Sequence, residues 1–186
     1  MNPGFRIVCL CGSAGALPAY IDILREMPID TGMAFLVLTH RRGGRPCWLP
    51  EIIARSTRMS VQQAEDGTVF IPNHIYVMPP GTCMTTDGSA LSLEPGSALP
   101  GWPHTFDIFL KSLAQSTHGR AVAVILSGMA GDGSAALDAI RTSGGVSFAQ
   151  TGAAYTSMPD TAIDTGKVDF SGSASEISMR IAHLAA

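Results

Sequence analysis

The chain has 186 residues, of which 46% are hydrophobic and 15% are charged, and its formal net charge at pH 7 is -3. We expect a single domain, 1–186, because this length and composition allow one sizeable buried core. A slightly acidic chain lacks the basic stripe of nucleic-acid-binding proteins, so no nucleic-acid partner is expected. The first apolar run contains Arg6 and is too short for a signal peptide or a membrane span, which predicts a cytoplasmic protein without direct membrane insertion.

The four cysteines, Cys9, Cys11, Cys47 and Cys83, form no C-x-x-C pair. Cys9 and Cys11 alternate along one apolar run, so we expect them to pack as small apolar side chains. Reduced thiols of this kind fit a cytoplasmic setting.

The first apolar run, 5–11, predicts a strand that ends in the small residues 12–15, directly before a helical pattern. A second run, 34–38, is wholly apolar and predicts a strand buried on both faces, and it ends in Thr39-His40. The other elements expected in the first half are a helix over 17–27, a helix over 48–56, strands over 59–64 and 74–78, and a β-hairpin over 82–86 and 90–93. The apolar stripes of the two helices are expected to bury Leu17, Tyr20, Ile21 and Leu24, and Leu49, Ile52 and Ile53.

A third apolar run, 121–126, is again wholly apolar and predicts a strand, and it ends in the glycine-rich loop 127–133. The remaining elements expected are a helix over 105–116 capped by Thr105, a helix over 134–142, a strand over 146–149, a short helix over 161–165, a strand over 168–170 and a C-terminal helix after a capping box at 173–176. Residues 94–103, rich in Pro and Gly, are expected to form the most mobile loop. Strands alternating with helices predict an α/β fold: a doubly wound, mostly parallel sheet with helices on both faces, to which the hairpin is an antiparallel appendage.

Three reactive side chains follow three separate apolar strands. Ser13 follows the first, His40 the second, and Asp132 lies in the loop after the third. The carboxyl ends of parallel strands share one edge of a sheet, so the three side chains can meet there as an acyl-transfer triad. Backbone N–H groups at the start of the first helix, that of Ala14 among them, and in the loop at Met129 could hold the oxyanion.

Each of these residues also has an ordinary interpretation. Ser13 could be a helix N-cap beside packing glycines, His40 an ordinary loop histidine, and Asp132 a helix cap before Gly133-Ser134. It is their joint placement at one sheet edge that favours the triad.

Other chemistries have little support in the sequence. The turn at 12–15 lacks the first glycine of a dinucleotide fingerprint, and no Gly-Lys-Ser/Thr follows the loop 127–133 as a P-loop would require. The sequence contains no H-E-x-x-H and no paired His/Cys spacing of a metal site. We therefore expect neither a cofactor nor a metal.

Several segments in this order resemble the catalytic domain of the chemotaxis protein-glutamate methylesterases (CheB type). The resemblance covers nearly the whole chain. Its segments are Cys11-Gly12-Ser13-Ala14-Gly15-Ala16-Leu17, Thr39-His40, Ala64-Glu65-Asp66-Gly67, the run 71–81, Val124-Ile125-Leu126-Ser127-Gly128-Met129-Ala130-Gly131-Asp132-Gly133, Ser157-Met158-Pro159 and Ala162-Ile163-Asp164-Thr165-Gly166. The segment 124–133 is the most specific match of them.

The resemblance implies a Ser-His-Asp triad of Ser13, His40 and Asp132, with an oxyanion role for the main chain around Met129. The implied reaction is hydrolysis of γ-glutamyl methyl esters on the acidic cytoplasmic helices of chemoreceptors, and some members of the family also deamidate receptor glutamines. No receiver domain is recognised, so regulation by phosphorylation within this chain is not expected. A methyltransferase domain or protein is an expected partner, because the sequence resembles the branch in which the esterase domain is fused to a methyltransferase or stands alone.

The sequence departs from the family pattern at the nucleophile turn, where Cys11 and Ala16 replace glycines and Ala14 replaces a threonine. These departures leave two alternatives to the methylesterase: a catalytically weak binding or regulatory module of the same fold, and a serine esterase for small molecules. Arg41 and Arg42 directly follow His40, and we hypothesise that they steer an acidic substrate, although they could equally be a solvated basic loop.

Overall fold

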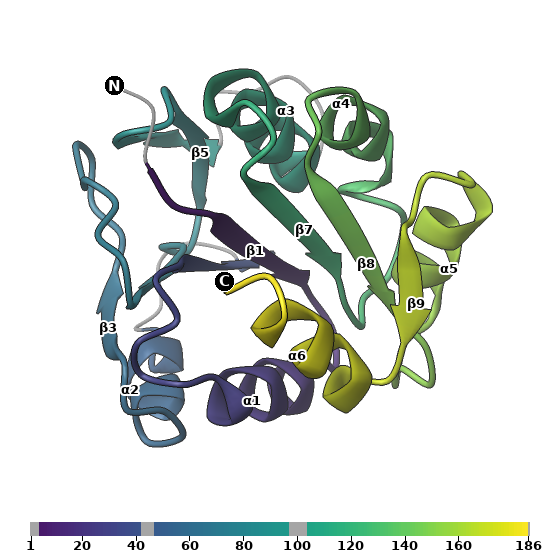
Figure 1. The fold of residues 1–186 in the computed structure, drawn as a ribbon, viewed down its shortest axis with the longest axis horizontal. Coiled ribbons are helices and arrows are strands. Elements are labelled where there is room, and N and C mark those ends of the chain that lie inside the picture. Colours follow the sequence, from purple (N-terminus) through teal and green to yellow (C-terminus); the bar gives the residue numbers. More distant parts are fainter. Residues whose placement is uncertain (1–3, 42–46, 97–103, 186) are drawn as a thin grey trace.

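The computed structural model describes residues 4–41, 47–96 and 104–185. Its centre is a seven-stranded sheet with the order β3-β4-β2-β1-β7-β8-β9 (Figure 1). The strands are β1 (Ile7–Gly12), β2 (Ala34–Thr39), β3 (Ser60–Gln63), β4 (His74–Val77), β7 (Ala121–Ile125), β8 (Val146–Gln150) and β9 (Phe170–Gly172). All neighbouring strands of this sheet pair in parallel, as predicted for the wholly apolar runs.

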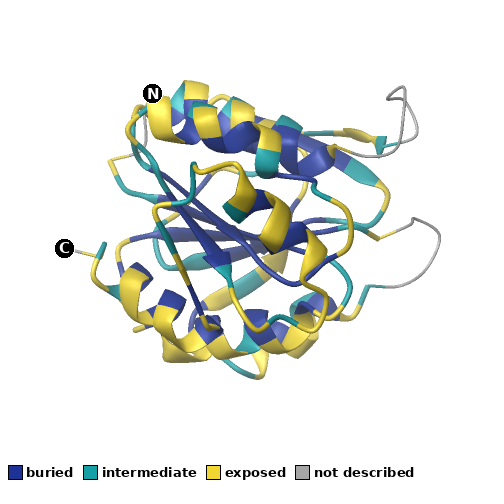
Figure 2. Ribbon diagram, turned by 90° about the vertical axis from the view of Figure 1, so that its right-hand side faces the viewer, coloured by how far each residue is buried: buried dark blue, intermediate teal, exposed yellow. Residues whose placement is uncertain are grey.

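Helices cover both faces of the sheet, which confirms the doubly wound α/β fold (Figures 1 and 2). One face carries α1 (Leu17–Glu26), α2 (Leu49–Ala54) and α6 (Ala174–Ala182), and the other carries α3 (Thr105–Thr117), α4 (Leu137–Thr142) and α5 (Ser157–Asp164). Strand β1 is buried throughout: Cys9 and Cys11 pack toward α3, and Val8 and Leu10 toward α1. Both cysteines are free thiols packed as small apolar side chains, as predicted, and burial raises the pKa of each.

The predicted hairpin is present as β5 (Thr82–Thr86) and β6 (Leu91–Pro95), which pair antiparallel beside α3. Its turn is stabilised by Asp87, whose carboxylate accepts hydrogen bonds from the backbone N–H groups of Ala90 and Ser89 at 2.9 and 2.8 Å. These hydrogen bonds lower the pKa of Asp87 to about 2. The hairpin is an appendage to the sheet, and Met84 and Leu91 attach it to the core on the α3 side.

Several predicted boundaries were wrong for local reasons. Helix α5 begins at Ser157 rather than 161, because Pro159 falls in the first turn, where its missing N–H costs nothing. The last strand lies at 170–172 rather than 168–170, and the first turn of the helix predicted over 134–142 is a 3₁₀ turn, η2 (Ser134–Ala136). Strand β6 takes in Glu94 and Pro95, and residues 97–103 of the predicted mobile loop lie outside the described residues.

The predicted N-cap of α3 was also wrong. Thr105 is the first residue of the helix, and its buried Oγ1 has no hydrogen-bond partner in the part of the chain that the structure describes. The carboxylate of Asp132 instead accepts from the first N–H groups of the helix. The predicted capping box at Ser173 and Glu176 is confirmed at the start of α6. In the described ranges, no helix is both long enough and apolar enough to span a membrane.

Candidate active site at the carboxyl ends of the strands

The strand order reverses at β1, which has β2 on one side and β7 on the other. In open α/β sheets ligands bind beyond the carboxyl ends of the strands at such a point. Gly12 of β1 pairs with Thr39 of β2, so the residues that follow them, Ser13 and His40, leave the sheet side by side.

The turn that carries Ser13 depends on glycine at position 12. A Cβ added to Gly12 would lie 2.5 Å from Cβ of Ala16 and 2.6 Å from the hydroxyl oxygen of Tyr20. Gly15 adopts a φ of +72°, which favours glycine, and completes the turn before α1. Ala16, one of the departures from the family pattern, is buried against Gly12, so the lack of a side chain at position 12 makes room for it.

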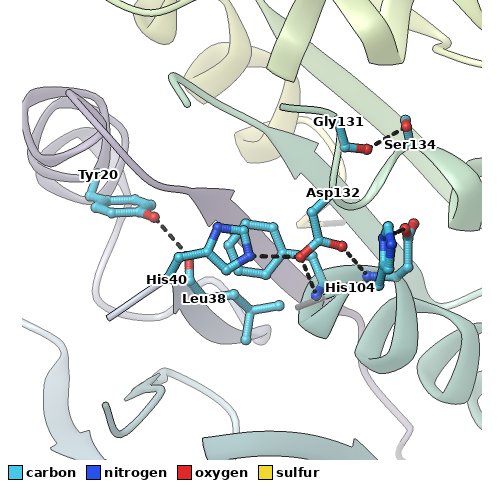
Figure 3. A network of polar contacts seen from close by, with 9 residues as sticks. Tyr20, Leu38, His40, His104, Gly131, Asp132 and Ser134 are labelled. Atoms are coloured by element: carbon cyan, nitrogen blue, oxygen red, sulfur yellow. Dashed lines mark hydrogen bonds and ion pairs between the residues drawn. The ribbon is translucent and has the colours of Figure 1, made fainter. Parts of the chain in front are cut away.

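His40 and Asp132 are hydrogen-bonded, with 2.7 Å between His40 Nε2 and Asp132 Oδ2 (Figure 3). The Asp132 side chain is only 5% exposed. It also accepts hydrogen bonds from the N–H groups of Phe106 and Asp107, both at 3.0 Å, which holds the carboxylate at the N-terminus of α3. The His40 ring stacks on Phe106, with 4.0 Å between ring centroids and an angle of 5° between the planes, so the ring is held on one face as well as at one edge.

This arrangement determines the tautomer of a neutral His40. Both oxygens of Asp132 already accept from backbone N–H groups, so the Nε2 atom of His40 is the donor in the pair. A neutral ring with its proton on Nε2 has a lone pair on Nδ1. Among the described residues, Nδ1 has no hydrogen-bond partner, so it is free to act as a base.

Ser13 and His40 line the same cavity, of about 510 Å³. Its other walls include Leu17 at the start of α1 and Leu49 and Ile52 on α2. Arg41, predicted to steer a substrate, also lines the cavity, and its Nη1 lies 3.5 Å from Cys47 Sγ; Arg42 lies outside the described residues. Within the described ranges the Ser13 hydroxyl is in no hydrogen bond, so the serine and histidine share the cavity without a direct contact, as is common before substrate binds.

The two backbone N–H groups expected to hold an oxyanion are both available. In the described part of the chain, neither the Ala14 nor the Met129 N–H donates a hydrogen bond. Gly128 N–H donates to the Tyr155 carbonyl at 3.0 Å, which ties the Met129 loop to the segment before α5. Ala130, the next residue of this loop, has a φ of +65°, a strained conformation for a residue with a side chain.

A second buried carboxyl group, Asp107, lies beside Asp132. Burial raises the pKa of Asp107, and the charge of Asp132 raises it further, against smaller opposing effects of Lys111 and His104. Ligand atoms of His104, Asp107 and Asp132 all lie within 4.8 Å of one another, which is a spacing that a metal ion could use. Asp132 is already bonded to His40 and to two backbone amides, so its role in the triad accounts for its position without a metal.

The structure thus brings Ser13, His40 and Asp132 to one sheet edge. Sequence reasoning missed several neighbours of the triad. Phe106 lies in the core as predicted, but its support of the His40 ring was not foreseen. Leu17 and Ile52 were expected to be buried, whereas both are exposed and line the cavity. Ser127, in the same motif as Asp132, was not singled out at all, because its burial and its contact with Ala14 depend on residues distant in the sequence.

The comparisons with known proteins decide the family. Residues 8–181 match the family model described as CheB methylesterase. The chain belongs to the CheB methylesterase family. It is 31% identical over 175 residues to the protein-glutamate methylesterase/protein-glutamine glutaminase 1 of Carboxydothermus hydrogenoformans, a match that covers 89% of this chain and 51% of that protein.

Two other relatives have a similar sequence identity to this chain. The protein-glutamate methylesterase FrzG of Myxococcus xanthus is 30% identical over 149 residues, covering 80% of this chain and 45% of that protein. A 104.1 kDa protein of Rhodobacter capsulatus is 36% identical over 127 residues, covering 65% of this chain and 13% of that protein. The chain therefore spans about half the length, or less, of these relatives.

A solved structure shows the same fold. The crystal structure of the Thermotoga maritima CheB methylesterase catalytic domain superposes with a TM-score of 0.87, covering 97% of this chain and 99% of that chain at 22% sequence identity. The seven-stranded parallel sheet with its two-stranded appendage is thus a CheB catalytic-domain fold.

Proposed function

We propose that this chain is a cytoplasmic serine methylesterase that hydrolyses γ-glutamyl methyl esters on chemoreceptors. One observation carries the proposal: His40 is hydrogen-bonded to Asp132 through Nε2 and lines, together with Ser13, the same cavity. Family membership supports the reaction, since relatives of this chain are named protein-glutamate methylesterases.

In the first step Ser13 Oγ attacks the carbonyl carbon of the ester, and Nδ1 of His40 takes the hydroxyl proton. The imidazolium that forms is stabilised by the negative charge of Asp132, which accepts a hydrogen bond from Nε2–H while the proton stays on His40. The negative charge that develops on the carbonyl oxygen is stabilised by the N–H groups of Ala14 and Met129.

In the second step the tetrahedral intermediate collapses. His40 returns its proton to the leaving methoxide, methanol departs, and a glutamyl ester of Ser13 remains. Water then attacks this acyl-enzyme with His40 as base, which releases the free γ-carboxylate and restores the Ser13 hydroxyl. No metal or cofactor takes part in this proposed mechanism.

The same acyl-enzyme forms from a glutamine side chain if ammonia leaves instead of methanol. Relatives of this chain carry the name protein-glutamine glutaminase, which supports a second activity of this kind on receptor glutamines. The proposed partners are the acidic cytoplasmic helices of the receptors, together with a methyltransferase that forms the esters. The positive charge of Arg41, which lines the cavity, would attract such an acidic surface.

The test is methanol release from methylated receptor by the wild-type chain, Ser13→Ala and Ser143→Ala. Ser143 precedes β8 at the amino ends of the strands, so its replacement controls for the loss of a serine hydroxyl away from the site. We expect the first variant to lose about 10³-fold or more in kcat and the second to keep wild-type activity. The absence of any Ser13-dependent release would contradict the proposal and leave a binding module, while Ser13-dependent activity on small esters alone would favour a small-molecule esterase.

A further inference from the structure

We infer that Ser127 is a positioning residue for this esterase: its buried hydroxyl holds the peptide groups beside Ser13 so that the Ala14 N–H points at the developing oxyanion. The inference rests on the proposed function. Ser127 is the second residue after β7 and is only 1% exposed, so it cannot itself contact a substrate.

The hydroxyl of Ser127 connects two segments that are distant in the sequence. It donates to the Ala14 carbonyl at 2.8 Å and accepts from the Tyr155 N–H at 3.0 Å. A hydroxyl has one proton, and the competing Tyr155 carbonyl is farther away, at 3.5 Å, so the proton belongs to the bond with Ala14. One hydroxyl therefore joins the nucleophile turn to the segment that precedes α5.

The main chain of Ser127 is anchored separately. Its N–H donates to Gln150 Oε1 at 3.1 Å, and its carbonyl accepts from the Ser13 N–H at 2.9 Å. Neither bond involves the hydroxyl. Removing the hydroxyl therefore leaves the backbone of Ser127 in place and releases only the Ala14 carbonyl and the Tyr155 N–H.

The geometry of the turn explains why the Ala14 carbonyl matters. A peptide group is planar, so the Ala14 N–H points opposite to the Ser13 carbonyl in the same plane. The Ser13 carbonyl accepts from the Ala16 N–H at 3.2 Å, a long hydrogen bond. The 2.8 Å bond from Ser127 to the Ala14 carbonyl holds the following peptide group, so the Ala14 N–H is fixed from both sides.

The close packing around Gly15 shows how little freedom this region has. A Cβ at position 15 would lie 2.9 Å both from Ser127 Oγ and from Cδ2 of the Tyr155 ring. The turn, the Ser127 hydroxyl and Tyr155 are thus packed against one another. An oxyanion donor must be correctly oriented before the reaction, because its contribution to catalysis depends on not having to reorganise.

The experiment measures kcat and KM for methanol release from methylated receptor by wild type, Ser127→Ala, Ser127→Thr and Ser147→Ala. Ser147 is a matched control: it is a fully buried strand serine whose hydroxyl donates to the Lys167 carbonyl at 2.9 Å, away from the turn. An oxyanion donor stabilises the transition state rather than the bound substrate, so its misplacement affects kcat more than KM. We expect Ser127→Ala to lower kcat by about 10- to 100-fold with KM changed by no more than about twofold. Ser127→Thr keeps the hydroxyl and is expected to stay within about threefold of wild-type kcat, and Ser147→Ala to keep wild-type kcat.

Each outcome decides the matter. Wild-type kcat in Ser127→Ala, an equal fall in Ser147→Ala, or a Ser127→Thr variant as slow as Ser127→Ala would overturn the inference and leave the proposed function intact. A wild-type chain without Ser13-dependent activity would overturn both. If Ser127→Ala does not fold, Ser127→Cys takes its place: its thiol is a much weaker donor, so kcat at least about tenfold lower supports the inference and unchanged kcat overturns it.

Discussion

Replacing Asp132 by Asn probes the triad, because an amide keeps the size of the carboxylate but not its charge. Asp132 accepts three hydrogen bonds: Oδ2 from His40 Nε2 and Phe106 N–H, and Oδ1 from Asp107 N–H. An amide has one oxygen that accepts and an NH₂ group that donates. With its oxygen at the Oδ2 position Asn keeps the bonds from His40 and Phe106. With its oxygen at the Oδ1 position it keeps the bond from Asp107, and its NH₂ group donates to His40 Nε2 once the ring proton has moved to Nδ1.

The two orientations therefore make the same number of hydrogen bonds, and they differ in the tautomer of His40. In the first, His40 keeps its proton on Nε2, so Nδ1 remains the base and the variant loses only the negative charge that stabilises the imidazolium. That charge is worth about 4 kcal/mol for a pair about 4 Å apart at an effective dielectric constant of about 20, which corresponds to a fall in kcat of about 10³-fold. In the second, Nδ1 carries the proton and cannot act as the base, so the expected fall is about 10⁴-fold. We therefore expect kcat to fall by about 10³-fold or more.

Two measurements check the Asp132→Asn prediction. Methanol release gives kcat, and the ¹⁵N spectrum of His40 shows which ring nitrogen carries the proton. Urea unfolding should show a loss of about 1–3 kcal/mol, because one backbone N–H, that of Asp107 or that of Phe106, is left facing a donor. A proton on Nε2 should go with a fall in kcat of about 10³-fold and a proton on Nδ1 with a fall of about 10⁴-fold; a kcat within about tenfold of wild type would refute the electrostatic role of Asp132.

Three further predictions concern residues around the triad. Ala130→Gly should raise the free energy of unfolding by about 0.5–1 kcal/mol in urea titrations, because it removes the strain of a φ of +65°; destabilisation would contradict this. Burial raises the pKa of Asp107 above 3.8, so ionising this carboxyl group destabilises the folded wild-type protein as the pH rises above about 4. The stability of Asp107→Asn relative to wild type should therefore increase between about pH 4 and about pH 7. A difference in unfolding free energy that stays constant across this range in urea titrations would refute the prediction. Replacing both Arg41 and Arg42 by Glu should lower kcat/KM on receptor by about 3- to 10-fold at low salt, with less effect at high salt and none on a small neutral ester; equal losses on both substrates would argue against steering.

The convergence of the triad could be predicted from the sequence because it depends on local signals. Three apolar runs, two of them without any polar residue, suit a parallel sheet buried on both faces, and the carboxyl ends of such strands share an edge. Ser13 and His40 each lie one residue past the end of a strand, so the pairing of Gly12 with Thr39 is sufficient to place them side by side. Asp132 reaches the same edge because its loop follows β7, the strand on the other side of β1.

The details that could not be predicted all depend on partners distant in the sequence. Leu17 and Ile52 have helical spacing, which does not distinguish a core position from the wall of a cavity. Thr105 is a normal N-cap residue type, but a carboxylate from 26 residues away, Asp132, accepts from the Phe106 N–H in its place. The contact of Ser127 with Ala14 spans 113 residues, so no local pattern reveals it.

Covalent labelling of the nucleophile tests the central claim most directly. A fluorophosphonate probe reacts with a serine hydroxyl that an adjacent base activates, and peptide mass spectrometry identifies the modified residue. We predict one adduct per chain, on Ser13, with a labelling rate lower by about 10²-fold or more in His40→Ala. An adduct on another serine, or labelling of Ser13 that does not depend on His40, would contradict the proposal that these two residues and Asp132 act as one catalytic unit.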